Sequence, residues 1–173
     1  WEVENSAISP HVDAMVEALY TRLQRRGFLE RDVRRMVNQD RNVFASLLLK
    51  LGIGDALVTG MTRPFAQTMR EVRQVLDPAE GKVPFGIHLM IGKNYTVFLA
   101  DTTINERPSA ELLAHIATET AAVARRLGHE PRVAFLSYST FGYPKGERAE
   151  YVRKAVSVLD KRQVDFEYDG EMA

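Results

Sequence analysis

The sequence lacks cysteine altogether, and this absence excludes disulfide bonds, thiolate catalysis and zinc sites built on cysteine. It also lacks an excess of charge of either sign, since 23 Lys and Arg residues balance 23 Asp and Glu residues. Proteins that bind nucleic acid usually carry a basic excess that displaces counterions from the phosphates, so we expect no nucleic-acid partner. Any site for an anion must therefore be local.

Long hydrophobic runs are missing as well. No apolar stretch approaches the roughly 20 residues that a membrane-spanning helix needs, and the run Leu47-Leu48-Leu49 ends at Lys50. The first residues show neither the basic start nor the apolar stretch of a signal peptide, and they lack an initiator Met. We therefore expect no membrane contact, a cytoplasmic location and a chain cut from a longer polypeptide.

The N-terminal part of the sequence predicts helices. Apolar residues recur at helical spacing from Met15 to Leu23, and Gly27 is placed to end that helix. Further helices are expected over 30–37, 42–51 and 64–76. The short apolar run 56–59 predicts a buried strand before the last of these helices.

The second half of the sequence alternates strands with helices. A hairpin is expected over 85–100, because Gly92-Lys93-Asn94 has the chemistry of a tight turn. Helices over 108–128 and 147–159 flank an apolar strand over 133–136, and a last strand begins at 164. This alternation is typical of parallel α/β sheets. The sequence predicts a three-layer αβα fold, with a mostly parallel sheet and the hairpin as its antiparallel edge. Residues 1–53 form a helical segment continuous with an αβα subdomain over 54–173.

In open α/β sheets, ligands bind beyond the carboxyl ends of the strands. Thr59, Gly60, Thr62 and Arg63 follow the strand predicted over 56–59. Hydroxyl groups, a glycine and a cation beside the start of a helix can together hold an anion. The alternative is an ordinary turn in which Thr62 caps the next helix.

A second polar loop leaves the strand predicted over 133–136. Successive backbone amides in such a loop can bind a phosphate, although the spacing is not that of a Walker A loop. A purely structural turn is the alternative. Bulky Phe141 and Tyr143 can instead cover a flat group or a partner subunit. The candidate ligand-binding residues here are Ser137, Ser139, Thr140, Gly142 and Lys145.

The other candidate positions favour structural roles. Asp169 and Glu171 flank a glycine, and a helix cap or a solvated surface is favoured over a metal site, since no third ligand is identifiable. Asp101 follows the hairpin, where turn chemistry is the commoner use of an aspartate. There is no Gly-x-Gly-x-x-Gly and no pairing of a nucleophile with a base, so we predict no catalytic residue and no metal site.

These segments together resemble the phosphate acetyl/butyryltransferase family, in their order and spacing across nearly the entire chain. The segments that carry the resemblance are 54–63, 97–102, 132–140 and 168–171. Within that family the chain is most similar to the C-terminal domain of large bacterial malic enzymes, through 23–27, 37–42, 139–148 and 164–173.

The resemblance implies a fold of the phosphate acetyltransferase and isocitrate dehydrogenase type. It implies a regulatory domain of an NADP-dependent malic enzyme, which binds acetyl-CoA or a related acyl-CoA or phosphate effector and associates with itself. Malic and NADP-binding domains missing from this chain would oxidatively decarboxylate malate to pyruvate with NADP and Mg or Mn, so this chain itself is expected to hold no cofactor. The residues that match the family's ligand cleft are Thr59, Gly60, Thr62, Arg63, Ser137, Ser139, Thr140 and Gly142.

Two alternatives stay open. The first is a fragment of an active phosphate acetyltransferase, which transfers acetyl between CoA and phosphate. The family's later active-site motifs are not found in this sequence, so we expect the chain to be inactive on its own. The second is a purely structural dimerisation unit.

Overall fold

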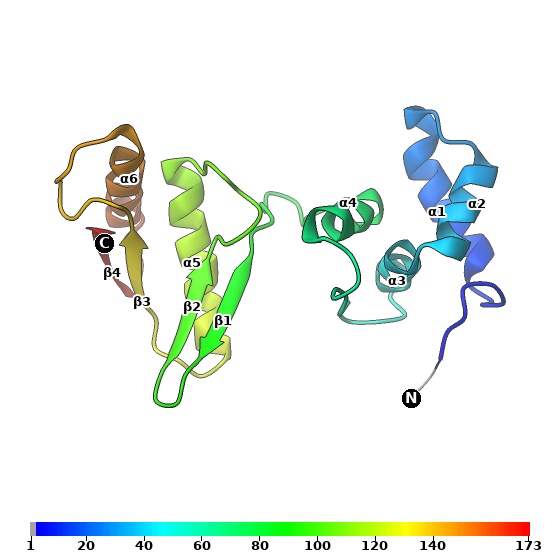
Figure 1. Ribbon diagram of the computed structural model, residues 1–173, viewed down its shortest axis with the longest axis horizontal. Helices are drawn as coiled ribbons and strands as arrows, with labels where there is room; N and C mark the ends of the chain where they lie inside the picture. The colour runs from blue at the N-terminus through cyan, green and yellow to red at the C-terminus, as the bar shows by residue number, and fades with distance from the viewer. Residues whose placement is uncertain (1–2) are drawn as a thin grey trace. The chain divides into compact units, whose positions relative to one another are not determined.

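The computed structural model describes residues 3–173, so the first two residues of the segment predicted over 1–53 lie outside it. The chain divides into two compact units, Trp1–Lys82 and Val83–Ala173, and each is described by itself (Figure 1). The division falls after Lys82 and not after residue 53, because the helix Phe65–Val75 packs against the N-terminal helices. No helix in the described part of the chain is long and apolar enough to cross a membrane.

The first unit is built from helices. They are α1 (Val12–Leu23), which continues as the short 3-10 turn η1 (Gln24–Arg26), α2 (Glu30–Gln39), α3 (Arg41–Lys50) and α4 (Phe65–Val75). The predicted helices are confirmed. Gly27 ends the first helical stretch at φ +86°, a left-handed conformation that glycine adopts without a steric penalty. All four α-helices contribute to one core, whose fully buried members include Met15, Leu19, Val33, Leu47 and Val75.

The strand predicted over 56–59 is wrong. These residues belong to an irregular connection between α3 and α4, and Val58 exposes 96% of its surface. A strand needs a neighbouring strand to pair its backbone groups, and the described part of the first unit contains no other strand. A short apolar run was therefore insufficient evidence for a buried strand.

The second unit alternates strands and helices, as predicted. Its elements are β1 (Ile87–Ile91), β2 (Thr96–Ala100), α5 (Ala110–Arg126), β3 (Arg132–Leu136), α6 (Glu147–Arg162) and β4 (Glu167–Met172). Ser109 caps α5, because its hydroxyl accepts a hydrogen bond from the amide of Leu112. Small alanines of α5 and α6 let the helices approach each other and pack with Phe135, Leu159 and Phe166 in one core.

The strands of the second unit form two pairs. β1 and β2 are antiparallel, with Ile87 opposite Ala100 and Ile91 opposite Thr96. β3 and β4 are parallel, from Arg132 opposite Glu167 onward. The αβα class is confirmed, with one correction: among the described residues the hairpin is not the edge of the parallel sheet, because no backbone hydrogen bond joins β2 to β3.

Candidate functional site

Arg63, the cation of the first candidate segment, is held between two carboxylates of the first unit. Its Nη1 donates to Oδ2 of Asp40 at 2.6 Å and to Oε2 of Glu71 at 2.7 Å. Asp40 lies just before α3 and Glu71 lies within α4, so the guanidinium links the start of α3 to the middle of the helix packed against it. The hydrogen bonds to Asp40 and Glu71 raise the pKa of Arg63 above its ordinary value.

Glu71 is the buried centre of this network. It accepts hydrogen bonds from Nδ2 of Asn42 at 2.6 Å and from Nε2 of Gln67 at 2.9 Å. Burial acts to raise the pKa of Glu71, but the hydrogen bonds from Asn42, Gln67 and Arg63 outweigh it and lower the pKa. Thr59 joins the network as well, because its hydroxyl donates to Oδ1 of Asn42 at 2.5 Å.

The first candidate segment is thus partly brought together. Thr59 and Arg63 share one polar network, whereas Gly60 and Thr62 lie exposed on the connection between α3 and α4. Two carboxylates surround one guanidinium, so an anionic ligand would compete with them for Arg63. The alternative in which Thr62 caps α4 is wrong, because Pro64 holds the capping position and no side chain caps this helix.

The second candidate loop is built around Glu171 of β4, whose side chain has no exposed surface (0%). Its Oε1 accepts hydrogen bonds from the hydroxyl of Ser139 at 2.7 Å and from the amide of Gly142 at 2.8 Å. Nη1 of Arg153, on α6, lies 2.7 Å from the same oxygen. Burial acts to raise the pKa of Glu171, but these three donors together lower it below its ordinary value.

The buried position of Glu171 corrects its interpretation as a helix cap or a solvated residue. A charge is buried only where it is paired and hydrogen-bonded, and Arg153 supplies the pairing. The second carboxylate oxygen of Glu171, Oε2, is buried and has no hydrogen-bond partner among the described residues. Sequence reasoning also missed Asp40, Asn42 and Glu71, although Asp40 precedes a helix as N-cap residues do.

The remaining residues of the second loop lie around this anchor. The amide of Ser137 donates to the carbonyl of Met172 at 2.9 Å, which extends the pairing of β3 with β4 into the loop. Thr140 and Lys145 are exposed. The aromatic rings of the loop project outward as well, since Phe141 exposes 65% and Tyr143 exposes 83% of its surface.

Asp101 organises the connection after β2. Its Oδ1 accepts hydrogen bonds from the amides of Gly86, Thr103 and Ile104, and its Oδ2 accepts from the amide and the side chain of Asn105. Burial acts to raise the pKa of Asp101, but these donors outweigh it and lower the pKa from 3.8 to about 2. The prediction that Asp101 stabilises a turn through hydrogen bonds to its carboxylate is confirmed.

Comparison with known proteins identifies the family. The family described as Phosphate acetyl/butaryl transferase matches residues 1–173. The chain belongs to this family. The NADP-dependent malic enzyme of Rhizobium meliloti is 49% identical over 172 residues, which are 99% of this chain and 23% of the relative. The resemblance predicted from the sequence is therefore confirmed, down to the malic enzymes among which the similar relatives lie.

Phosphate acetyltransferases are similar to the chain as well. The enzyme of Bacillus subtilis is 34% identical over 161 residues, which are 92% of this chain and 49% of the relative. The crystal structure of a phosphotransacetylase from Streptococcus pyogenes superposes with a TM-score of 0.83 at 31% identity, over 97% of this chain and 51% of that one. The chain thus spans about a quarter of the malic enzyme and about half of the phosphate acetyltransferases.

Proposed function

We propose that this chain is a regulatory acetyl-CoA-binding and oligomerisation domain of an NADP-dependent malic enzyme. Its similarity to the Rhizobium meliloti malic enzyme, at 49% identity, exceeds its similarity to the Bacillus subtilis phosphate acetyltransferase, at 34%. The malic and NADP-binding domains of such an enzyme would decarboxylate malate with NADP and Mg or Mn. The described residues of this chain include no group of three His, Cys, Asp or Glu side chains that suits a metal ion.

The observation that carries the proposal is the loop anchored by Glu171. Ser139 and Gly142 are fixed by the buried carboxylate, while Lys145 and the rings of Phe141 and Tyr143 face outward. In the proposed complex the ammonium of Lys145 attracts a phosphate of CoA, and the hydroxyl of Thr140 donates a hydrogen bond to that ligand. The aromatic rings offer flat apolar surfaces for the adenine ring.

Arg63 favours binding over acyl transfer. A group that stabilises charge in a transition state must already be oriented toward that charge, whereas Arg63 is oriented toward two carboxylates within 2.7 Å of its Nη1 and must first exchange them. Thr59, Gly60, Thr62 and Arg63 are therefore proposed as a separate anion-binding region of the first unit, in which a bound anion displaces Asp40 and Glu71 from Arg63.

Calorimetric titration of the chain with acetyl-CoA tests the proposal. We expect saturable binding. Lys145→Ala should weaken it about tenfold, because the variant lacks one charge-assisted hydrogen bond. The matched control is Lys161→Ala, since Lys161 is also an exposed lysine but lies near the end of α6. Absence of binding, or equal affinity of the two variants, would overturn the assignment of this loop.

The second candidate is phosphate acetyl transfer, favoured by the similarity to the two transferases. Formation of acetyl-CoA from acetyl phosphate and CoA discriminates the two functions. We expect no turnover by the chain alone. Turnover within the usual enzyme range, roughly 1–1000 per second, would establish the transferase instead.

Self-association, the other part of the proposal, is supported by apolar side chains at the surface of the second unit. Leu89, Met90 and Ile91 of β1 expose 45%, 50% and 76% of their surface. Exposed apolar patches of this kind commonly mark interfaces. Sedimentation equilibrium measures the outcome, and a monomer at all concentrations would contradict it.

A further inference from the structure

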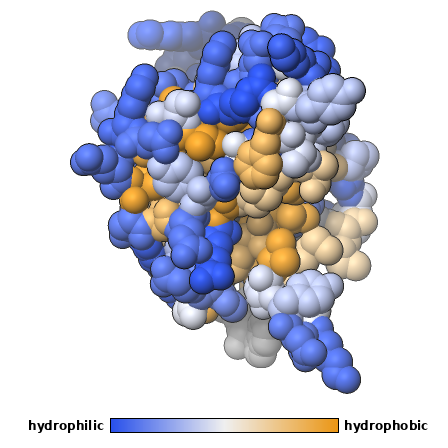
Figure 2. Space-filling model, turned by 90° about the vertical axis from the view of Figure 1, so that its left-hand side faces the viewer, coloured by the Kyte–Doolittle hydropathy of each residue, from blue (hydrophilic) through white to orange (hydrophobic). Residues whose placement is uncertain are grey.

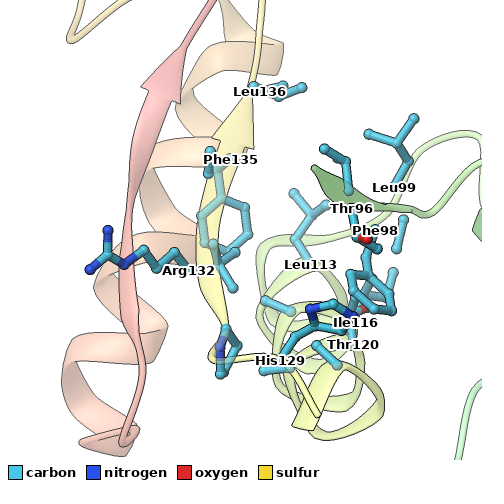
Figure 3. A pocket seen from close by; sticks show the side chains of 18 of the residues that line it. Thr96, Phe98, Leu99, Leu113, Ile116, Thr120, His129, Arg132, Phe135 and Leu136 are labelled. Carbon is cyan, nitrogen blue, oxygen red and sulfur yellow. The ribbon is translucent and has the colours of Figure 1, made fainter. Parts of the chain in front are cut away.

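A cavity of about 470 Å³ separates β2 from β3 in the second unit. Figure 3 shows its construction: Phe98 and Leu99 belong to one wall, Phe135 and Leu136 to the other, and Leu113 of α5 lies between the two strands. Helix α5 forms the floor through residues that also include Ile116, Ala117, Thr120 and Ala121. All of these residues lie within the second unit.

The two walls of this cavity are free strand edges. β2 pairs only with β1 and β3 pairs only with β4, so the described residues offer no partner to the backbone groups on the facing edges. Figure 1 shows the arrows of β2 and β3 pointing the same way, as expected for strands joined through a helix such as α5. The two pairs therefore resemble parts of one sheet from which a strand has been left out.

The side chains around the cavity are mainly apolar. Val97 exposes 40% and Leu136 exposes 64% of its surface, and both line the cavity. Figure 2 shows apolar side chains gathered between hydrophilic ones on the face that it presents. Exposed edges with apolar side chains favour pairing with another segment.

We propose that this cavity and its two edges, which we call the strand slot, take one extended apolar strand that pairs with β2 and β3 at once. Neighbouring strands lie about 4.8 Å apart, so one inserted strand requires edges about 9.6 Å apart. The inserted strand converts two pairs into one five-stranded sheet over α5 and α6. Both free edges are five residues long, which sets the length of the inserted strand.

Other occupants satisfy only part of the slot. An apolar small molecule covers the side chains but leaves the backbone groups of both edges unpaired. Water pairs those groups but leaves Val97 and Leu136 in contact with solvent. Only an extended backbone with apolar side chains meets both requirements, the arrangement found when a peptide adds to a sheet.

We assign the strand to the part of the family's polypeptide that this chain does not match. The phosphotransacetylase of Streptococcus pyogenes contains nearly all of this fold, yet this chain covers only 51% of it. A similar length of polypeptide therefore accompanies the fold in that relative. This inference does not require acyl-CoA binding, so either proposal can fail without the other.

Amide hydrogen exchange of the chain tests the slot with a synthetic peptide as the probe. The peptide carries five alternating valine and isoleucine residues, flanked by lysines for solubility. We expect it to slow exchange about tenfold or more along both β2 and β3 when present at about 1 mM. A second peptide with proline at its central position should have no effect, because proline removes a backbone donor from the ladder.

A pair of variants distinguishes strand insertion from non-specific hydrophobic binding of the peptide. Leu136→Asp places a carboxylate in the slot, and we expect it to weaken peptide binding about tenfold or more, since insertion would desolvate the charge. Leu127→Asp is the control, because Leu127 exposes 55% of its surface but does not line the cavity. Both positions are exposed, so both variants should fold.

Each outcome decides the proposal. Protection of both edges that Leu136→Asp abolishes supports it. No protection, protection of one edge only, or equal binding of the proline peptide overturns it. Protection that rises with the concentration of the chain alone would show that a second copy fills the slot, and it would overturn the assignment to the unmatched part of the family's polypeptide.

Discussion

Replacing Asp101 by asparagine provides a sharp test of how a single carboxylate holds the connection after β2. Five hydrogen bonds converge on it, from the amides of Gly86, Thr103, Ile104 and Asn105 and from the side chain of Asn105. An asparagine keeps one acceptor oxygen but turns an amide group toward donors. Asp101→Asn therefore loses the negative charge and part of its acceptor capacity together.

The lowered pKa sets the expected magnitude. A fall from 3.8 to about 2 corresponds to about 2.4 kcal/mol, which we reduce to about 1–2 kcal/mol because water partly screens this group. Since the pKa is lower in the folded state, the stabilisation is complete above pH 3.8 and is lost as the pH falls toward 2. Exchange of the Gly86 and Thr103 amides should become about 5- to 30-fold faster in Asp101→Asn at neutral pH.

The assay is amide exchange followed by NMR, with stability measured in parallel between pH 5 and pH 2. The natural chain should lose about 1–2 kcal/mol more than Asp101→Asn over this interval. Glu106→Gln is the control, because Glu106 is an exposed carboxylate on the same connection. If the amides exchange equally in both variants, or if the pH dependence is unchanged in Asp101→Asn, the reasoning is refuted.

Two further perturbations test the core and the second loop. Leu159→Ala removes a fully buried side chain from the core of the second unit and should reduce the free energy of unfolding by about 2–5 kcal/mol in chemical denaturation, whereas Leu127→Ala at an exposed position should change it by less than about 0.5 kcal/mol. Ser139→Ala removes one donor to Glu171 and should accelerate exchange of the Gly142 amide about tenfold, as measured by NMR, while the helices keep their exchange rates. Unchanged exchange at Gly142 would show that Ser139 does not help to fix the loop.

The helices were predictable because their signals are local. Met15 and Leu19 recur at helical spacing, and Gly27 has the conformational freedom that a helix end requires, so no knowledge of distant contacts was needed. The hairpin was predictable for the same reason. In contrast, the apolar run 56–59 looked like a buried strand, and its exposure depends on the absence of a pairing strand in the described part of the first unit.

The candidate site was less accessible to prediction, because its geometry depends on contacts between distant residues. Glu171 resembled a surface carboxylate until Arg153 and Ser139 were found beside it, 18 and 32 positions earlier in the chain. Arg63 resembled a free cation, since its spacing from Asp40 and Glu71 carries no recognisable motif. Residue types indicated where polar chemistry gathers, and only the packing determined which groups bind one another.

The two carboxylate oxygens of Asp40 bind different partners, so a ligand that reaches Arg63 affects only one of them. Oδ1 accepts the amides of Asn42 and Val43 at the first turn of α3, whereas Oδ2 binds the guanidinium. An anion that draws Arg63 away therefore breaks its ion pairs with Asp40 and Glu71 but leaves the hydrogen bonds at the start of α3 intact. Arg63 can therefore change partners while α3 keeps its first turn.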